Sequence, residues 1–131
     1  MSSLLQNPRH LRFAYLSFFI VQSFDCILLA TVSPLLFTNA SILTGPTQFF
    51  IRGNSTNLFP LVLLLFLLRG HHISTPTGQR VVWIFILYHS LVLIFMLWFR
   101  FYGPWVLEQY KWSIVVHAVW LASGVAAVVG Y

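Results

Sequence analysis

Three ionisable side chains inside long apolar stretches are the residues of this chain that could do chemistry: Asp25, His89 and His117. An aspartate at the centre of a membrane helix costs about 2.5–3.5 kcal/mol even on insertion scales, so we expect it to face other helices, to be protonated or to have a partner. Gln22 precedes Asp25 by one turn on the same helix face and can supply a hydrogen bond. Acid and base chemistry on an apolar substrate needs such a carboxyl and imidazole pair.

Depth along the helices predicts that these three side chains can meet. With a rise of about 1.5 Å per residue, Asp25 lies about 18 Å, His89 about 12 Å and His117 about 20 Å from the inner ends of their spans. All three then occupy the middle third of a hydrocarbon layer about 30 Å thick. Several interpretations stay open: a hydrogen bond that only locks the helices, for example to a histidine or to Ser90; a pocket for the polar end of a lipid or sterol, with an isomerase or proton relay as its catalytic form; or no meeting at all.

Metal and thiol chemistry receive less support from the sequence. Two histidines and one carboxylate can bind a metal, but ligand pairs at helical spacing and a second buried carboxylate are both lacking, so we predict no metal site and no cofactor. The single cysteine, Cys26, cannot form an intramolecular disulfide. We expect His71 and His72 to be a solvated loop pair. Two N-x-S/T triplets make Asn39 and Asn54 candidate glycosylation sites.

The amino-acid composition indicates that membrane-spanning helices position these residues. Hydrophobic types make up 59% of the 131 residues and charged types only 7%, whereas a soluble domain has about 25% charged residues. A soluble monomer is excluded because there is too little polar surface to enclose a core in water, and intrinsic disorder is excluded because disordered chains are poor in large apolar residues. The net charge of +5 comes from scattered cations near span ends, which fits a membrane protein better than a nucleic-acid-binding one.

The apolar stretches predict an all-α membrane protein, a single four-helix bundle over residues 1–131. The predicted spans are 13–37, 55–73, 81–101 and 112–131. The second span has a clean apolar run of only eleven residues, 58–68, so a re-entrant or interfacial segment is its alternative. Before this span we predict a polar connection that contains a turn at Gly45-Pro46.

Charged, aromatic and small residues orient the predicted bundle. With the N-terminus in the cytoplasm, four cations lie inside and three outside, as the positive-inside rule favours. The four are Arg9, Arg12, Arg69 and Arg80. Aromatic residues around the third connection are expected to anchor at the headgroup layer: Trp98, Tyr102, Trp105, Tyr110 and Trp112. Small residues of the fourth span, from Ala118 to Gly130, predict close packing within the bundle or against another membrane protein.

Part of the chain resembles two families of small membrane proteins. Arg80 opens a span, Tyr88-His89 lies midway along it, and Trp112 leads to His117 in the last span. This pattern is similar to that of four-span proteins of the broad DoxX-like kind. The tetrapeptide Arg-Phe-Tyr-Gly at 100–103 resembles one in the ergosterol-biosynthesis scaffold family, whose members tether sterol enzymes at the endoplasmic reticulum. Here the tetrapeptide follows the third span, later than expected for that family, and neither resemblance transfers a functional residue.

These observations predict a small multi-pass protein of the endoplasmic reticulum membrane with both termini in the cytoplasm. The location rests on the short spans and the lack of a targeting presequence. We expect an accessory or scaffold subunit that contacts the bilayer and has no chemistry of its own. The small-residue face of its fourth span is the expected surface for another membrane protein. The alternative is a lipid- or sterol-binding protein or an isomerase that uses Gln22, Asp25, His89 and His117. Nucleic acid is not an expected partner.

Overall fold

The structure, a computed structural model, describes residues 6–31, 45–102 and 111–130. They form four helices: α1 (Arg9–Thr31), α3 (Gly45–Leu68), α4 (Pro76–Tyr102) and α5 (Lys111–Val129). None of the described residues lies in a β-strand, and every helix contains an apolar stretch long enough to cross a membrane. The predicted all-α, four-helix membrane bundle is therefore confirmed.

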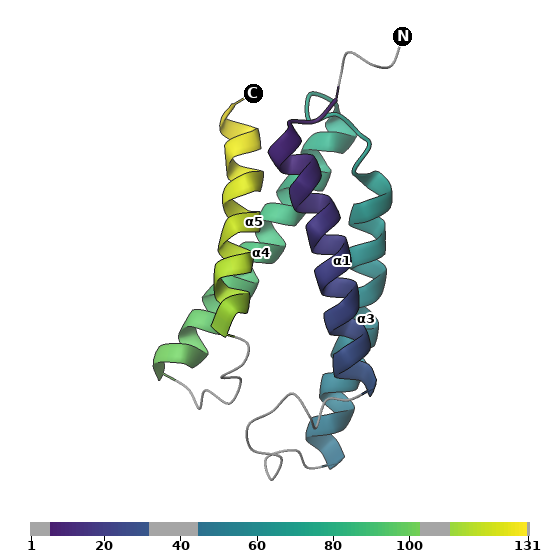
Figure 1. Cartoon of the computed structure of the whole chain (residues 1–131), viewed down its shortest axis with the longest axis vertical. Helices are drawn as coiled ribbons and strands as arrows, with labels where there is room; N and C mark the ends of the chain where they lie inside the picture. Colours follow the sequence, from purple (N-terminus) through teal and green to yellow (C-terminus); the bar gives the residue numbers. More distant parts are fainter. Residues whose placement is uncertain (1–5, 32–44, 103–110, 131) are drawn as a thin grey trace.

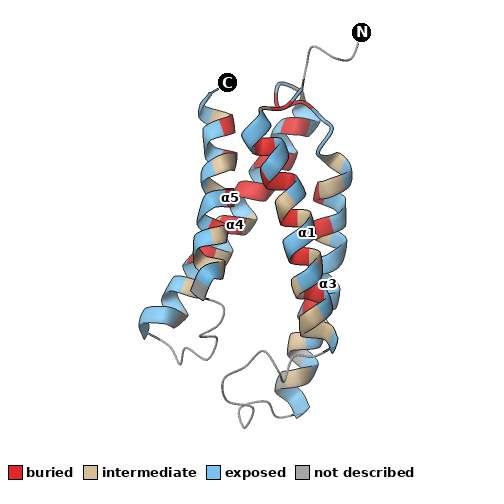
Figure 2. Cartoon of the chain, in the orientation of Figure 1, coloured by how far each residue is buried: buried red, intermediate tan, exposed pale blue. Residues whose placement is uncertain are grey.

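The four helices are arranged as two antiparallel pairs, α1 with α3 and α4 with α5 (Figure 1). The two pairs approach each other at the end of the molecule where the termini and the α3–α4 connection lie, and they diverge toward the opposite end. Most of the buried residues lie in the half near the termini (Figure 2). The core that joins all four helices is therefore in that half, and the opposite half is held mainly by contacts within each pair.

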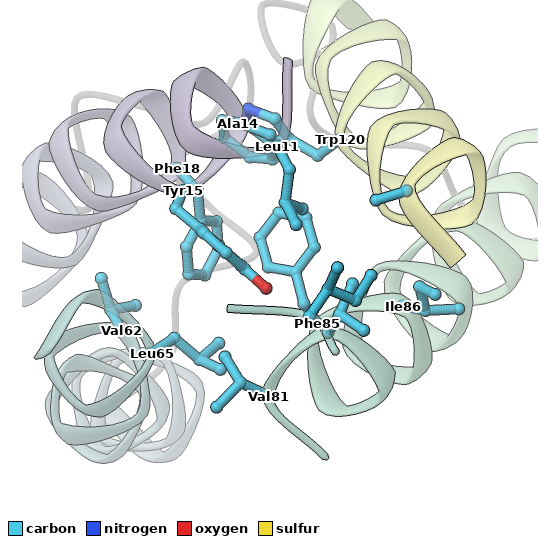
Figure 3. Close-up of a cluster of buried hydrophobic side chains, with 13 residues drawn as sticks. Leu11, Ala14, Tyr15, Phe18, Val62, Leu65, Val81, Phe85, Ile86 and Trp120 are labelled. Atoms are coloured by element: carbon cyan, nitrogen blue, oxygen red, sulfur yellow. The ribbon is translucent and has the colours of Figure 1, made fainter. Parts of the chain in front are cut away.

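Aromatic side chains form the centre of the shared core (Figure 3). Phe18 of α1 packs against Phe85 of α4 edge to face, with ring centroids 5.5 Å apart, and against Trp120 of α5 in the same way at 5.3 Å. Edge-to-face pairs are worth about 0.5–1.5 kcal/mol beyond the area they bury. Such contacts matter in a bilayer because lipid tails are as apolar as the core, so helices associate by packing rather than by the hydrophobic effect.

A glycine allows α5 to lie close against α4. A Cβ atom added at Gly124 would be 2.8 Å from Cγ1 of Ile86 and 3.4 Å from Cδ1 of Phe85. Ala127, one turn later, is also buried in the core. One side of the small-residue segment of α5 is thus used for packing within the bundle.

A buried asparagine fixes the N-terminal segment to the connection between α3 and α4. The Nδ2 of Asn7 donates to the backbone carbonyls of Arg69 at 3.0 Å and His71 at 2.7 Å, and its Oδ1 accepts from the backbone N–H of Ile73 at 2.9 Å. One side chain thereby satisfies three backbone groups that no helix can pair. The sequence analysis did not single out Asn7.

The connection that follows is also more ordered by side chains than the sequence suggests. His72 is buried, and its Nδ1 accepts from the backbone N–H of Ser74 at 3.2 Å, so the expectation of a solvated pair is wrong for His72, whereas His71 is exposed. Thr75 precedes α4, and its Oγ1 accepts from the backbone N–H of Gly78 at 3.0 Å, as an N-cap residue does. Both contacts set the direction in which α4 begins.

The helix α3 differs from the predicted second span at both ends. It begins at Gly45 instead of residue 55 and ends at Leu68 instead of residue 73. The turn predicted at Gly45-Pro46 is wrong, because these residues begin the helix, where proline is tolerated since its missing N–H would have no helical partner. The helix then continues through Pro60 without interruption, and its residues 51–68 are long and apolar enough to span.

The other three helices lie near their predicted ranges. α1 begins four residues before the predicted span, α4 extends from Pro76 to Tyr102 around the predicted 81–101, and α5 starts at Lys111. The predicted end of the first span at 37 and the aromatic residues Trp105 and Tyr110 lie outside the described residues.

Candidate functional site

His89 of α4 and His117 of α5 meet in the interior of the bundle. Their Nδ1 atoms are 2.9 Å apart and share a hydrogen bond, and the two side chains are 0% and 5% exposed. One Nδ1 must donate and the other must accept, so the two imidazoles are never both positively charged in this arrangement. The structure thus brings together two of the three ionisable residues that depth along the spans placed near one level.

Aromatic rings enclose His89. The ring centroids of Phe18, Phe85, Tyr88 and Trp120 all lie within reach of the imidazole, the nearest at 4.3 Å and the farthest at 5.2 Å. The Nε2 of His89 is buried and has no hydrogen-bond partner within the described part of the chain. The described contact of His89 with another polar side chain is the one with His117.

A second polar contact near the histidine pair joins α5 to α1. The Nε1–H of Trp120 donates to the hydroxyl of Ser17 at 2.9 Å. The ring of Trp120 also lies edge to face against His117, with centroids 5.2 Å apart. Trp120 and His117 are therefore both fixed on the face of α5 that looks toward α1.

Between these faces lies a cavity of about 190 Å³ that contains the third ionisable residue. Asp25 lines the cavity from α1, and His117 lines it from α5. The remaining lining residues are Val21, Trp112, Ser113, Val116 and Trp120. On α5 the lining positions recur at helical spacing, and on α1 they are one turn apart, so each helix contributes a single face.

The carboxyl group of Asp25 is partly buried and makes no hydrogen bond or ion pair with any described residue. It is not bonded to either histidine or to Ser90, so the interpretation in which Asp25 only locks the helices through such a bond is not observed. Gln22 is buried one turn away, and its Oε1 likewise has no partner in the described ranges. Gln22 does not line the cavity.

The cavity is nearer to the end of the bundle opposite the termini than to the termini themselves. At about 1.5 Å per residue, Asp25 lies about 9 Å from the last residue of α1, and His117 about 9 Å from the first residue of α5. At the rim, Trp112 is 69% exposed and Val21 is 39% exposed. Two of the lining residues are therefore exposed on the outer surface of the bundle.

Asn54, one of the two candidate glycosylation sites, is not among the residues that line the cavity. Among residues 6–31, 45–102 and 111–130, no three His, Cys, Asp or Glu side chains lie close enough to hold a metal ion. Asn54 is exposed but lies within α3, in the first turn of its membrane-spanning part, and Asn39 is outside the described residues. Glycosylation of either stays a prediction.

Sequence reasoning missed the two indoles that form the cavity walls. Trp112 was expected to be an interfacial anchor, and Trp120 was not considered. A signal was present, because Ser113, His117 and Trp120 are spaced so that they share one face of a helix. The spacing alone does not show that this face of α5 lies opposite α1.

Comparison with known proteins adds no further constraint on the site. The chain matches no family model, no curated protein and no solved structure. The resemblances to DoxX-like proteins and to the sterol scaffold family stay predictions. The cavity contains a carboxyl group with no partner among the described residues, an imidazole held by a second imidazole, and two indoles.

Proposed function

We propose that this protein binds a lipid-like molecule from the bilayer and holds its polar group in the cavity between α1 and α5. The observation that carries the proposal is that Asp25 and His117, on different helices, line the same cavity. Polar groups inside a membrane span are expensive and are found where they have a functional role or a partner. Asp25 has no partner among the described residues, so a ligand is the natural candidate for one.

The size of the cavity limits which part of a ligand it holds. Sites for whole drug-sized ligands have volumes of about 300–1,000 Å³, whereas this cavity has about 190 Å³. It therefore accommodates a polar group and the first carbons attached to it. The remaining apolar part of the molecule lies along the exposed helix faces at the rim, in contact with lipid.

Binding without catalysis is the form of this proposal that the geometry favours. An acid and base pair needs its members within hydrogen-bond reach of one another or of the same proton. The Nδ1 atoms of the two histidines are engaged with each other at 2.9 Å, and Asp25 is bonded to neither. Asp25 and His117 thus form no acid and base pair with each other among the described contacts, and we propose binding alone.

Filling the cavity tests the proposal. Val116→Trp places a large ring at a position that lines the cavity, and Val119→Trp places the same ring on the lipid-facing side of the same helix, where Val119 is 57% exposed. We expect a photoactivatable long-chain probe with a small polar end group to label peptides of α1 and α5 that line the cavity in the natural protein and in Val119→Trp, but not in Val116→Trp. Equal labelling of all three proteins would exclude a ligand cavity at this place.

An accessory role remains a second candidate because of an exposed stripe on α5. Ala118, Ala122 and Ala126 recur every fourth residue and are all exposed, so they are not used by packing within the bundle. Small residues at this spacing allow another membrane helix to approach closely. Affinity purification in mild detergent tests this role: a protein that co-purifies with the natural chain and is lost with Ala122→Leu supports it, and recovery of the chain alone contradicts it.

The proposed orientation rests on the distribution of the arginines. Arg9, Arg12, Arg69 and Arg80 are all at the end of the bundle that carries the termini. By the positive-inside rule this end faces the cytoplasm, and we assign the protein to the endoplasmic reticulum. Protease protection of a tag at the N-terminus, in microsomes separated from other membranes, tests both statements: a tag cut only after the membrane is opened contradicts the orientation.

A further inference from the structure

We propose that the polar group held in the cavity between α1 and α5 is a protonated amine, so the ligand is an amphiphilic amine with a long apolar chain or ring system. This inference rests on the proposed binding function and names the chemical class of the ligand. It follows from three features of the cavity: the sign of its charge, its aromatic walls and its position in the bilayer.

The cavity contains one carboxyl group among its described lining residues, that of Asp25, and a cationic ligand would favour its ionised form. Asp25 is the only acidic residue in the described part of the chain, and it makes no ion pair there. No lysine or arginine is among the described residues that line the cavity. A cationic ligand would supply the missing partner, and at a site with little water the attraction is stronger than at a protein surface. A carboxylate or phosphate would be repelled for the same reason.

The walls of the cavity favour a cation over a neutral group. Trp112 and Trp120 both line it, and indole is the side chain that attracts cations most strongly through its ring face. The N–H of Trp120 is already engaged by Ser17, so what this indole has left to offer a ligand is its ring. A carboxylate combined with aromatic rings is the arrangement used to recognise ammonium groups, whereas a hydroxyl group gains little from the ring faces.

The polar residues that line the cavity can complete the hydrogen bonding of an ammonium group. Three N–H donors of a primary ammonium need acceptors, and the cavity offers the Asp25 carboxylate and the Ser113 hydroxyl. The Nε2 of His117 becomes a third acceptor when the proton shared with His89 belongs to His117. The cavity lies about 9 Å along α5 from its first residue, close enough to the headgroup layer for an amine to enter without crossing the hydrocarbon centre.

Three matched probes test this inference with the natural chain in phosphatidylcholine nanodiscs. They carry the same saturated chain and the same diazirine and differ only in the end group: primary amine, alcohol or carboxylic acid. Labelling of peptides that line the cavity is divided by labelling of the lipid-facing segment 91–95 of α4, which corrects for partition into the bilayer. We expect a ratio about tenfold higher for the amine than for the alcohol, which corresponds to about 1.4 kcal/mol of binding free energy, and the lowest ratio for the acid.

Two variants with a matched control assign the preference to residues. Asp25→Asn keeps the shape of the side chain and removes its charge, so the amine ratio should fall to that of the alcohol. Trp112→Leu should lower the amine ratio several-fold, while Trp98→Leu, an exposed tryptophan of α4 outside the cavity, should leave it unchanged. If Asp25→Asn does not fold, the Trp112 and Trp98 variants still decide the question.

The possible outcomes separate this inference from the function on which it rests. Cavity labelling by the alcohol that equals labelling by the amine, with no effect of Asp25→Asn, would overturn the amine and leave a lipid-binding cavity. Cavity peptides labelled by none of the probes above the level of the α4 segment would overturn both. A tenfold preference for the amine that Asp25→Asn abolishes is the result expected here.

Discussion

A single methyl group at Gly124 is expected to weaken the contact between α4 and α5. The added Cβ would lie 2.8 Å from Cγ1 of Ile86, well inside van der Waals contact, and this atom is not the mobile end of its side chain. Overpacking of this kind costs about 1–3 kcal/mol. The His89–His117 contact between the same two helices would lengthen as the helices separate.

Gly53→Ala provides the control because Gly53 also lies within a helix, and a Cβ there would have nothing within 4 Å. Both changes gain the same helix propensity, about 0.5–1 kcal/mol, so the difference between the variants isolates the overpacking. The measurement is the thermal midpoint of each variant in a mild detergent, followed by tryptophan fluorescence. We expect Gly53→Ala to be as stable as the natural chain or more stable, and Gly124→Ala to be less stable than Gly53→Ala by about 1–3 kcal/mol. A Gly124→Ala protein as stable as Gly53→Ala would refute the close approach of the two helices.

Three further perturbations test other parts of the structure. Asn7→Ala leaves the backbone N–H of Ile73 and two carbonyls without partners, and at about 1–3 kcal/mol for an unsatisfied group it should lower the melting midpoint and speed hydrogen exchange at Ile73. Gly78→Ala drives a Cβ into the backbone of the preceding connection, so it should reduce the yield of folded protein, which size-exclusion chromatography measures. His89→Leu should destabilise the protein by about 1–3 kcal/mol because His117 loses its partner. The double variant with His117→Leu should lose less stability than the sum of the two single variants. Strict additivity of the two losses in thermal unfolding would contradict a direct bond.

The number and approximate position of the helices follow from composition, because a chain with so few charged residues has few segments that can lie outside a membrane. The beginning of α3 could not be predicted in the same way. Gly45-Pro46 is as typical of a turn as of a helix start, and the polar residues before Leu58 gave no reason to prefer the helix. Composition also does not show that α3 packs against α1.

Depth along the helices was enough to place His89 and His117 near one level but not to say which residues face each other. Rotation about the helix axis decides that, and it is fixed by packing partners such as Phe18 and Gly124. The same limit explains why it stayed open whether Asp25 meets the histidines. In the structure Asp25 lines a cavity that, of the two histidines, only His117 lines as well. Asn7 was missed because its role depends on a connection more than sixty residues away in sequence.

The central claim, that the cavity between α1 and α5 holds a molecule from the bilayer, is tested most directly by native mass spectrometry. The chain is purified from its membrane in mild detergent, transferred to nanodiscs and released in the mass spectrometer. The claim predicts one added mass, the same in the natural protein and in Val119→Trp, that is absent from Val116→Trp although this variant is folded. An unliganded natural protein, or an added mass that persists in Val116→Trp, would contradict the claim.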